Sequence, residues 1–329
     1  MTISKLGVIG GGAWGTALAQ VAASGGEETL LWAREPEVVE SINEGQENSV
    51  FLAGVKLSPV IRATCNLAEL DGCDALLVVT PAQHMRSVLS GLPSSGKPLI
   101  LCSKGMEEAT TRLMHEVARE EQPDSPVAVL SGPTFAHEVA AGLPAAVTFA
   151  IEDASVGEAL RARIAKPFFR PYLSDDVIGA EIGGAVKNVL AIACGVVEGR
   201  GLGQNARAAL ISRGFAEMTR FGLAKGARLE TLAGLSGLGD LVLTCSSESS
   251  RNFSLGKGLG KGASAAELLA DKRTVAEGAS TAPVLQRAAE AIGVDMPIVA
   301  AVCDLLAQRA SAEEVVDRLL ARPLRSEGV

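Results

Sequence analysis

A glycine-rich turn near the start of the chain constrains the fold more than any other feature. Residues 5–15 read KLGVIGGGAWG, in which an apolar run leads into Gly10-x-Gly12-x-x-Gly15, and a helix-forming stretch follows. In this pattern the first glycine permits a tight turn, the second lets the backbone approach a pyrophosphate, and the third lets the helix pack close to the strand. The pyrophosphate then meets the free N–H groups of the helix N-terminus. The alternative is a turn without a ligand, but the strand–loop–helix order favours a dinucleotide site.

The rest of the first half alternates strands and helices. We expect strands at residues 6–9, 29–32, 74–79, 98–102, 127–130, 145–149 and 168–173, and helices at 14–24, 36–44 and 110–120. Near-continuous apolar runs such as 74–79 are typical of parallel strands buried on both faces. Repeated β-α-β order predicts an α/β domain with a Rossmann-type, doubly wound parallel sheet.

The second half differs in composition and in the spacing of its apolar residues. From Val177 onward the chain is rich in Ala, Leu and Gly with helical spacing, and we expect helices at 178–198, 205–221, 229–235, 264–270, 283–292, 296–307 and 313–320. Residues 322–329 read as a polar tail. The expected organisation is a nucleotide-binding domain over residues 1–176 and an all-helical, substrate-binding domain over residues 177–329.

Composition narrows the classes of function. The net charge is −8 and 3% of residues are aromatic, which argues against a broad nucleic-acid surface. Six scattered cysteines without C-x-x-C spacing predict no metal site and fit packed thiols in a reducing cytoplasm. We expect no membrane span, because no apolar stretch of about 20 residues is free of charge. The apolar helical half could bury a homodimer surface, which the sequence does not locate.

The choice of dinucleotide depends on the end of the second strand, which reads Trp32-Ala33-Arg34-Glu35. An acid there binds the ribose 2′-hydroxyl of NAD, whereas an arginine accommodates the 2′-phosphate of NADP. Arg34 can stack on adenine and pair with phosphate, but Glu35 would repel that phosphate. The pattern favours NADP(H) and leaves NAD(H) open.

Polar residues follow the later strands. Ser103-Lys104-Gly105 and Gly132-Pro133-Thr134 stand at expected carboxyl ends of strands, which face the ligand crevice of an open parallel sheet. Lys104 suits an anionic substrate or the cofactor. Thr134 is expected to be the N-cap of a helix that follows it.

The helical half carries the residues with acid–base chemistry. Lys187 lies in an apolar helix, where burial would depress its pKa and allow proton transfer near neutral pH; the alternative is a lysine that snorkels to solvent. Asp240, in a glycine-rich apolar turn, is a candidate partner for that lysine. Ser250, Arg251 and Asn252 lie in an expected serine-rich loop over residues 244–252, and they combine hydroxyl, guanidinium and amide donors suited to a phosphate.

Taken in order, these motifs resemble the bacterial NAD(P)-dependent sn-glycerol-3-phosphate dehydrogenases. The resemblance rests on matching segments from residue 10 to about 282, namely residues 10–19, 103–105, 131–136, 184–188, 237–241, 250–252 and 277–278. Each segment is modest alone, and their shared order is specific.

The resemblance implies a role for each matching residue. Lys187 would be the general acid in reduction and the base in oxidation, and Asp240 would orient it. The substrate, dihydroxyacetone phosphate or sn-glycerol 3-phosphate, would be bound by Lys104, Gly132, Thr134, Lys187, Asp240, Ser250, Arg251 and Asn252. The cofactor would contact Gly10, Gly12, Ala13, Trp14, Gly15, Arg34, Lys104, Ala136, Arg251, Val275 and Glu277. The product would supply phospholipid synthesis in the cytoplasm.

Two other functions stay open at the level of sequence. One is a related dehydrogenase that acts on 3-hydroxyacids, which would grip a carboxylate or thioester instead of a phosphate. The other is a regulator that binds nicotinamide nucleotides without turnover, in which a pairing of Lys187 with Asp240 would have no catalytic role.

Overall fold

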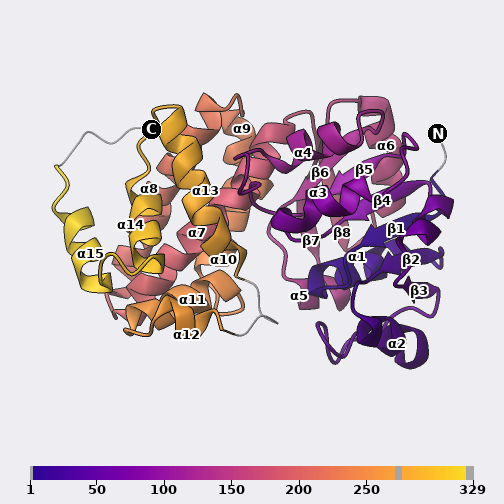
Figure 1. The fold of residues 1–329 in the computed structure, drawn as a ribbon, viewed down its shortest axis with the longest axis horizontal. Coiled ribbons are helices and arrows are strands. Elements are labelled where there is room, and N and C mark those ends of the chain that lie inside the picture. Colours follow the sequence, from indigo (N-terminus) through magenta and orange to yellow (C-terminus); the bar gives the residue numbers. More distant parts are fainter. Residues whose placement is uncertain (1–2, 271–275, 324–329) are drawn as a thin grey trace. The chain divides into compact units, whose positions relative to one another are not determined.

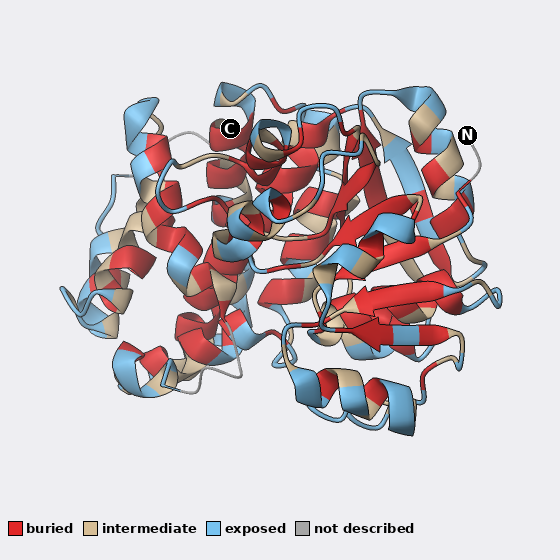
Figure 2. Ribbon diagram, turned by 45° about the vertical axis from the view of Figure 1, so that its right-hand side comes forward, coloured by how far each residue is buried: buried red, intermediate tan, exposed pale blue. Residues whose placement is uncertain are grey.

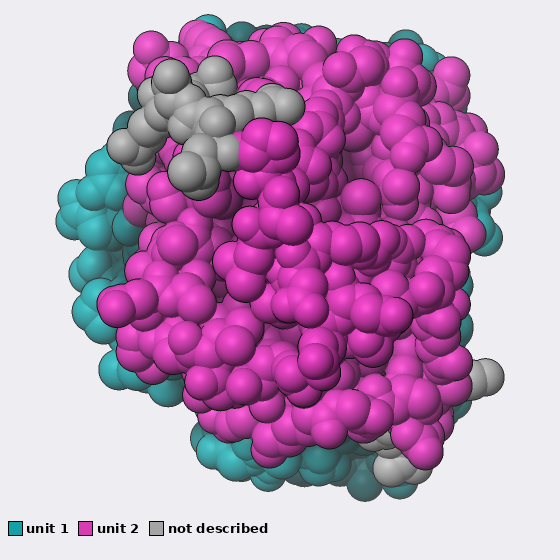
Figure 3. All heavy atoms as spheres, turned by 90° about the vertical axis from the view of Figure 1, so that its left-hand side faces the viewer, with its two compact units in different colours: residues 1–103, 114–177 teal, residues 104–113, 178–329 magenta. Residues whose placement is uncertain are grey.

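The computed structural model describes residues 3–270 and 276–323 and separates into two compact units (Figure 3). The first unit comprises Met1–Ser103 and Met114–Val177, and the second comprises Lys104–Leu113 and Ile178–Val329. The segment Lys104–Leu113 therefore groups with the helical half, although the sequence placed it in the nucleotide-binding half. The physical reason is burial, because Met106 and Leu113 are 0% and 2% exposed and belong to the hydrophobic core of the second unit.

The first unit is built on an eight-stranded sheet (Figure 1). The strands are β1 (Leu6–Ile9), β2 (Thr29–Trp32), β3 (Ile61–Thr64), β4 (Ala75–Val78), β5 (Leu99–Leu101), β6 (Val127–Ser131), β7 (Ala145–Ile151) and β8 (Phe169–Ser174). Their order is β3-β2-β1-β4-β5-β6-β7-β8, and every neighbouring pair is parallel except β6 and β7. The Rossmann-type prediction is confirmed, with an antiparallel step that the sequence pattern did not indicate.

The helices of the first unit connect these strands. They are α1 (Ala13–Ala23), α2 (Pro36–Gly45), η1 (Leu67–Gly72), α3 (Ala82–Ser90), α4 (Met114–Glu121), α5 (Ala136–Ala140) and α6 (Ala154–Ile164). All four residues of β1 and of β4 are buried, as expected for strands that are covered on both faces. Figure 2 shows this buried layer as red ribbon along the strands.

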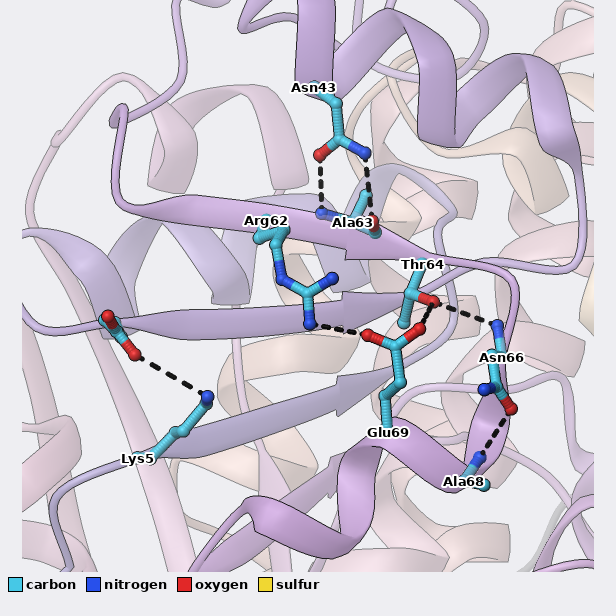
Figure 4. A network of polar contacts seen from close by, with 9 residues as sticks. Lys5, Asn43, Arg62, Ala63, Thr64, Asn66, Ala68 and Glu69 are labelled. Carbon is cyan, nitrogen blue, oxygen red and sulfur yellow. Dashed lines mark hydrogen bonds and ion pairs between the residues drawn. The ribbon is translucent and has the colours of Figure 1, made fainter.

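The edge strand β3 is held by side chains as well as by its backbone (Figure 4). Asn43, on α2, donates to the carbonyl oxygen of Ala63 at 3.0 Å and accepts from the N–H of Ala63 at 2.8 Å. Glu69 accepts from Thr64 at 2.7 Å and from Arg62 at 2.6 Å. Strand β3 was not among the predicted strands, because four residues with an exposed arginine give little strand signal.

The second unit is helical. Its elements are α7 (Val177–Gly199), α8 (Gly203–Ala224), α9 (Leu229–Leu232), the π-helix η2 (Leu235–Gly239), α10 (Asp240–Cys245), α11 (Arg251–Gly260), α12 (Ala265–Leu268), α13 (Glu277–Ala291), α14 (Pro297–Leu306) and α15 (Ala312–Leu320). Helices η2, α10 and α11 were not predicted from the sequence. The predicted start of α13 is six residues late, because Pro283 lies inside that helix.

Helix α7 runs through the hydrophobic core of the second unit and supplies Ile182, Val186, Val189 and Leu190 to it. By length and composition α7 is apolar enough to cross a membrane, but 94% of its most apolar 18-residue stretch is buried in the structure. Its burial is that of a core helix, and it gives no clear sign of a membrane span.

A buried carboxyl joins α8 to α14. Glu217, 2% exposed, accepts from the N–H groups of Ile298 at 2.8 Å and Val299 at 3.3 Å, at the first turn of α14. Burial raises the pKa of Glu217 to about 7, although these two N–H groups and Arg220 favour its charged form. The helix N-terminus is thus capped by a residue distant in sequence.

This pKa makes the stability of the second unit depend on pH. Because the folded-state pKa lies above the ordinary value of 4.5, the contribution of Glu217 is fully present below pH 4.5 and is lost as pH rises to about 7. The variant Glu217→Gln does not titrate. Between these pH values we expect the free energy of unfolding of the parent to fall by up to about 3 kcal/mol relative to that of the variant.

Urea unfolding of both proteins from pH 4.5 to 8 measures this difference. Glu230→Gln, at an exposed glutamate of the same unit, is the control and should follow the parent at every pH. A parent–variant difference that does not change with pH would contradict the assignment.

Candidate functional site

The glycine turn of the first unit has the geometry that a pyrophosphate requires. Gly10 follows β1 with a φ of 124°, and a Cβ on Gly15 would lie 1.9 Å from the carbonyl oxygen of Gly10. Neither position accepts a side chain. Gly12, by contrast, is exposed and has nothing within 4 Å of its Cβ position. It is the N-cap of α1, where its own lack of a side chain leaves the first N–H groups open to an anion.

Three other residues expected to contact the cofactor follow the strands β1 and β2 of the first unit. Ala13 and Trp14 form the start of α1 and pack partly against the sheet core. Arg34 lies two residues beyond β2 and donates from Nε and Nη2 to one oxygen of Glu35, at 3.2 and 2.9 Å. The arginine fork is thus engaged by the neighbouring acid, and its side chain is 76% exposed.

Gly132, Thr134 and Ala136 lie beyond the carboxyl end of β6. Gly132 has a φ of 158°, and a Cβ there would lie 2.9 Å from the backbone of Val147. Helix α5 begins at Ala136 with Phe135 as its N-cap. The expectation that Thr134 caps this helix is wrong, because its hydroxyl instead donates to the carbonyl oxygen of Gly132 at 3.3 Å.

The second unit brings two lysines to one carboxylate. Lys187 Nζ, on α7, lies 2.5 Å from Asp240 Oδ1, and Lys104 Nζ lies 2.7 Å from Asp240 Oδ2. Asp240 is 0% exposed and Lys187 is 5% exposed. The alternative of a snorkelling lysine is therefore wrong. Thr244 completes the group, because its hydroxyl accepts from Lys187 at 3.0 Å and donates to Asp240 Oδ1 at 3.3 Å.

The two lysines differ in protonation. Burial, together with the nearby Lys104 ammonium, lowers the pKa of Lys187 to about 7, although Asp240 favours its charged form. Burial also disfavours the charged form of Lys104, but Asp240 outweighs that effect and raises the pKa of Lys104. One lysine therefore remains an ammonium while the other can exchange its proton near neutral pH.

Local backbone geometry fixes Asp240. The π-helix η2 ends at Gly239, and Asp240 is the first residue of α10. A Cβ on Gly183 of α7 would lie 2.3 Å from the carbonyl oxygen of Ser236 in η2. Because Gly183 has no side chain, η2 packs directly against the backbone of α7. This packing places Asp240 next to Lys187.

Ser250, Arg251 and Asn252 form the start of α11 instead of the loop expected from the sequence. Ser250 is the N-cap and accepts from the N–H of Phe253 at 3.2 Å. Asn252 Oδ1 accepts from the N–H of Gly278 at 2.9 Å, and a Cβ on Gly278 would lie 2.5 Å from the carbonyl oxygen of Asn188. These contacts bring the N-terminus of α11 next to the residue that follows Lys187 in α7.

Glu277 begins α13 beside Gly278. Burial raises its pKa, against the opposing effects of Arg251, Lys104 and Lys187. Glu277 thus belongs to the same group of charges as the two lysines. The remaining residue expected at the cofactor, Val275, lies outside the described residues.

Sequence reasoning did not assign Thr244. It follows Asp240 by four positions, a spacing that places two side chains on one face of a helix. That signal could have identified Thr244 only if residues 240–245 had first been recognised as a helix.

The chain matches known proteins over most of its length. Residues 5–157 match the model of the NAD-dependent glycerol-3-phosphate dehydrogenase N-terminus, and residues 176–317 match that of its C-terminus. A protein named glycerol-3-phosphate dehydrogenase [NAD(P)+] from Erythrobacter litoralis is 65% identical over 324 residues, covering 98% of both chains. One of the same name from Novosphingobium aromaticivorans is 64% identical over 327 residues, again covering 98% of both.

A solved structure is similar as well. The crystal structure of glycerol-3-phosphate dehydrogenase from Coxiella burnetii matches with a TM-score of 0.93 and 37% identity, covering 97% of this chain and 99% of that one. The two family models together span most of the sequence, and the relatives match it nearly end to end. This chain belongs to the NAD-dependent glycerol-3-phosphate dehydrogenase family.

Proposed function

We propose that this chain interconverts dihydroxyacetone phosphate and sn-glycerol 3-phosphate, with NAD(P)H or NAD(P)⁺ as the hydride carrier. The observation that carries the proposal is the buried Lys187, bonded to Asp240 and Thr244, with a pKa of about 7. Reduction of a ketone by hydride leaves a developing alkoxide, which needs a positioned proton donor. A lysine that holds its proton near neutral pH can meet that need.

The charges around Lys187 suit a phosphorylated substrate. Lys104 and Lys187 bond to the buried carboxylate of Asp240. Arg251 and both lysines lie close enough to Glu277 to act on its pKa, and the raised pKa of Glu277 weakens its negative charge. Arg251 lies at the N-terminus of α11, where backbone N–H groups and the guanidinium fork both favour a phosphate. The amide of Asn252, whose oxygen is held by Gly278, keeps its nitrogen for a second acceptor.

The residues of the second unit act on the carbonyl oxygen. When bound, the nicotinamide cofactor supplies the hydride that reduces the C2 carbonyl. Lys187 holds a proton at Nζ, delivers it to the carbonyl oxygen in reduction and takes it back in oxidation. Asp240 and Thr244 fix the position of Nζ through the 2.5 and 3.0 Å bonds. Lys104, held charged by Asp240, is placed to bind an anionic oxygen of the substrate.

The first unit, in this proposal, binds the dinucleotide at residues 10–15. Gly12, exposed and free of neighbours, fits the approach of a pyrophosphate. The Arg34–Glu35 pair can bind either cofactor. The exposed guanidinium of Arg34 suits the 2′-phosphate of NADP, and the carboxylate of Glu35 suits the 2′-hydroxyl of NAD. We therefore keep both NADP(H) and NAD(H), with Arg34 favouring NADP(H).

We also propose a cytoplasmic location and a role in supplying glycerol 3-phosphate for phospholipid synthesis, the usual role of this family. All six cysteines are free thiols, as a reducing compartment allows.

Loss of the reduced-nicotinamide absorbance tests the reaction. We expect oxidation of NADPH and NADH with dihydroxyacetone phosphate, and no comparable rate with 3-ketoacids. Lys187→Ala should lower kcat by about 10²–10⁴-fold, the usual contribution of a general acid, and leave NAD(P)H affinity nearly unchanged. The control Lys261→Ala, at an exposed lysine of the same unit, should be fully active. An unchanged kcat in Lys187→Ala would remove this lysine from the mechanism.

The pH dependence of kcat/KM tests the coupling between the two lysines. Reduction requires protonated Lys187, so kcat/KM for dihydroxyacetone phosphate should fall as pH rises above about 7. In Lys104→Gln the pKa of Lys187 should rise, because a neighbouring ammonium is lost, and the descending limb should move to higher pH. In Asp240→Asn the loss of the carboxylate should move it the opposite way. Limbs that stay in place in both variants would refute the coupling.

Substitution of Arg251 tests whether this side chain recognises the phosphate of the substrate. A charge-assisted bond to phosphate is typically worth a factor of about 10–100 in affinity. Arg251→Ala should therefore raise KM for dihydroxyacetone phosphate by about that factor and leave KM for unphosphorylated dihydroxyacetone nearly unchanged. Arg309→Ala, which breaks an ion pair with Asp304, is the matched control. Equal effects of Arg251→Ala on both ketones would argue against a phosphate contact.

A further inference from the structure

A buried asparagine outside the glycine motif holds the glycine turn in place. Asn48 lies three residues beyond the end of α2 and is 0% exposed. Its Nδ2 donates to the carbonyl oxygen of Gly11 at 2.8 Å and to Thr16 Oγ1 at 2.8 Å. Its Oδ1 accepts from the N–H of Phe51 at 3.0 Å. One amide therefore ties the glycine turn and the first turn of α1 to the segment that follows α2.

The bond to Gly11 also determines the direction of the next N–H group. In a trans peptide the carbonyl oxygen of Gly11 and the N–H of Gly12 lie in one plane and point in opposite directions. Because Asn48 holds the Gly11 oxygen inward, the Gly12 N–H must point away from Asn48. Gly12 is the exposed residue of the turn, with no neighbouring atom within 4 Å of its Cβ position.

Thr16 strengthens the same connection. It is 0% exposed, and its N–H makes a helical bond to the carbonyl oxygen of Gly12 at 3.0 Å. Its hydroxyl accepts from Asn48 and lies 3.5 Å from the oxygen of Gly11. Both amide hydrogens of Asn48 are thereby used on the motif. If the Asn48 amide only stabilised its own loop, it would not need the hydrogen bonds to Gly11 and Thr16.

We propose that Asn48 is a positioning residue for the cofactor: by clamping the Gly11 carbonyl it aims the Gly12 N–H at the dinucleotide pyrophosphate. The inference rests on the proposed function, in which residues 10–15 bind this group. It assigns part of the affinity for the cofactor to a residue outside the glycine fingerprint, in the same way that hydrogen bonds behind a binding group orient it.

Two substitutions separate positioning from folding. Asn48→Asp keeps the shape and the acceptor for Phe51 but replaces the two N–H donors with an oxygen that faces the Gly11 carbonyl. Thr16→Val removes one of the two bonds from Asn48 and leaves the bond to Gly11. If positioning matters, the aspartate variant should lose much more cofactor affinity than the valine variant.

The chain offers a matched control in Asn43 (Figure 4). Its amide also donates to and accepts from the backbone, but its partner is Ala63 on the edge strand β3 instead of the glycine turn. Asn43→Asp makes the same chemical change in the same connecting region of the first unit, at an exposed position instead of a buried one. It should lower thermal stability without altering cofactor affinity.

Titration of NADH fluorescence, without any ketone present, measures the effect directly. We expect Asn48→Asp to raise the Kd for NADH by about tenfold, the usual cost of losing a group that orients a binding group. The Kd for ADP-ribose, which has the pyrophosphate and lacks nicotinamide, should rise by the same factor. At saturating NADH, kcat and the KM for dihydroxyacetone phosphate should stay within about twofold of the parent.

Several outcomes would overturn the inference. Parent-like NADH affinity in Asn48→Asp would do so, and so would an equal loss of affinity in Asn43→Asp, or an NADH effect without an ADP-ribose effect. If Asn48→Asp fails to fold, as judged by circular dichroism, Asn48→Ala decides, because it removes the bond to Gly11 without adding a charge; a parent-like Kd for NADH in that variant counts against the proposal. A parent that does not bind NADH at all would instead refute the proposed function.

Discussion

The chemistry of this molecule depends on one carboxylate shared by two amines. Asp240 is fully buried and accepts from Lys187 on one oxygen and from Lys104 on the other. A buried carboxylate needs a cation, because an unpaired charge in the interior is very costly. One cation would suffice for that. The second leaves an excess positive charge in a desolvated site. Burial first, and then this excess charge, lower the pKa of Lys187 to about 7.

The fold keeps this arrangement within a single unit. Lys187 comes from the core helix α7, Asp240 follows the π-helix η2, and Lys104 comes from a segment that follows the sheet strand β5 and packs with the helices. Burial of Met106 and Leu113 in the helical core holds that segment, and Arg287 donates to the carbonyl oxygen of Glu108 at 2.7 Å. The distances among the three charged groups are therefore set by the packing of the helical unit, not by the sheet.

The sequence predicted those features that depend on local pattern. Apolar strands buried on both faces, the glycine turn and the long helix around Lys187 were all recognisable, because each has its own periodicity or residue type. Features that depend on contacts between distant segments were not. The N-terminus of α11 looked like a serine-rich loop, since its helix is rich in glycine that packs against α7: a Cβ on Gly256 would lie 1.9 Å from the carbonyl oxygen of Ile192. Likewise Thr134 had the composition of a helix cap, but the helix begins one residue later than that role requires.

An acidic protein that binds two anions must create attraction locally, because its net charge of −8 gives none at long range. The two units do this by different physical means. In the proposed function, the first unit attracts a pyrophosphate through backbone N–H groups at the start of α1, which carry no net charge and must point in the right direction. The bond from Asn48 to the Gly11 carbonyl is the contact to which we assign the direction of the Gly12 N–H. In the second unit the attraction comes from cations that outnumber the charged acids beside them. Asp240 is shared by two lysines. Burial of Glu277 disfavours the charged form of its carboxyl. Backbone dipoles at a helix N-terminus favour one orientation of a bound anion, whereas the buried cations of the second unit also shift the pKa of the lysine that must exchange a proton.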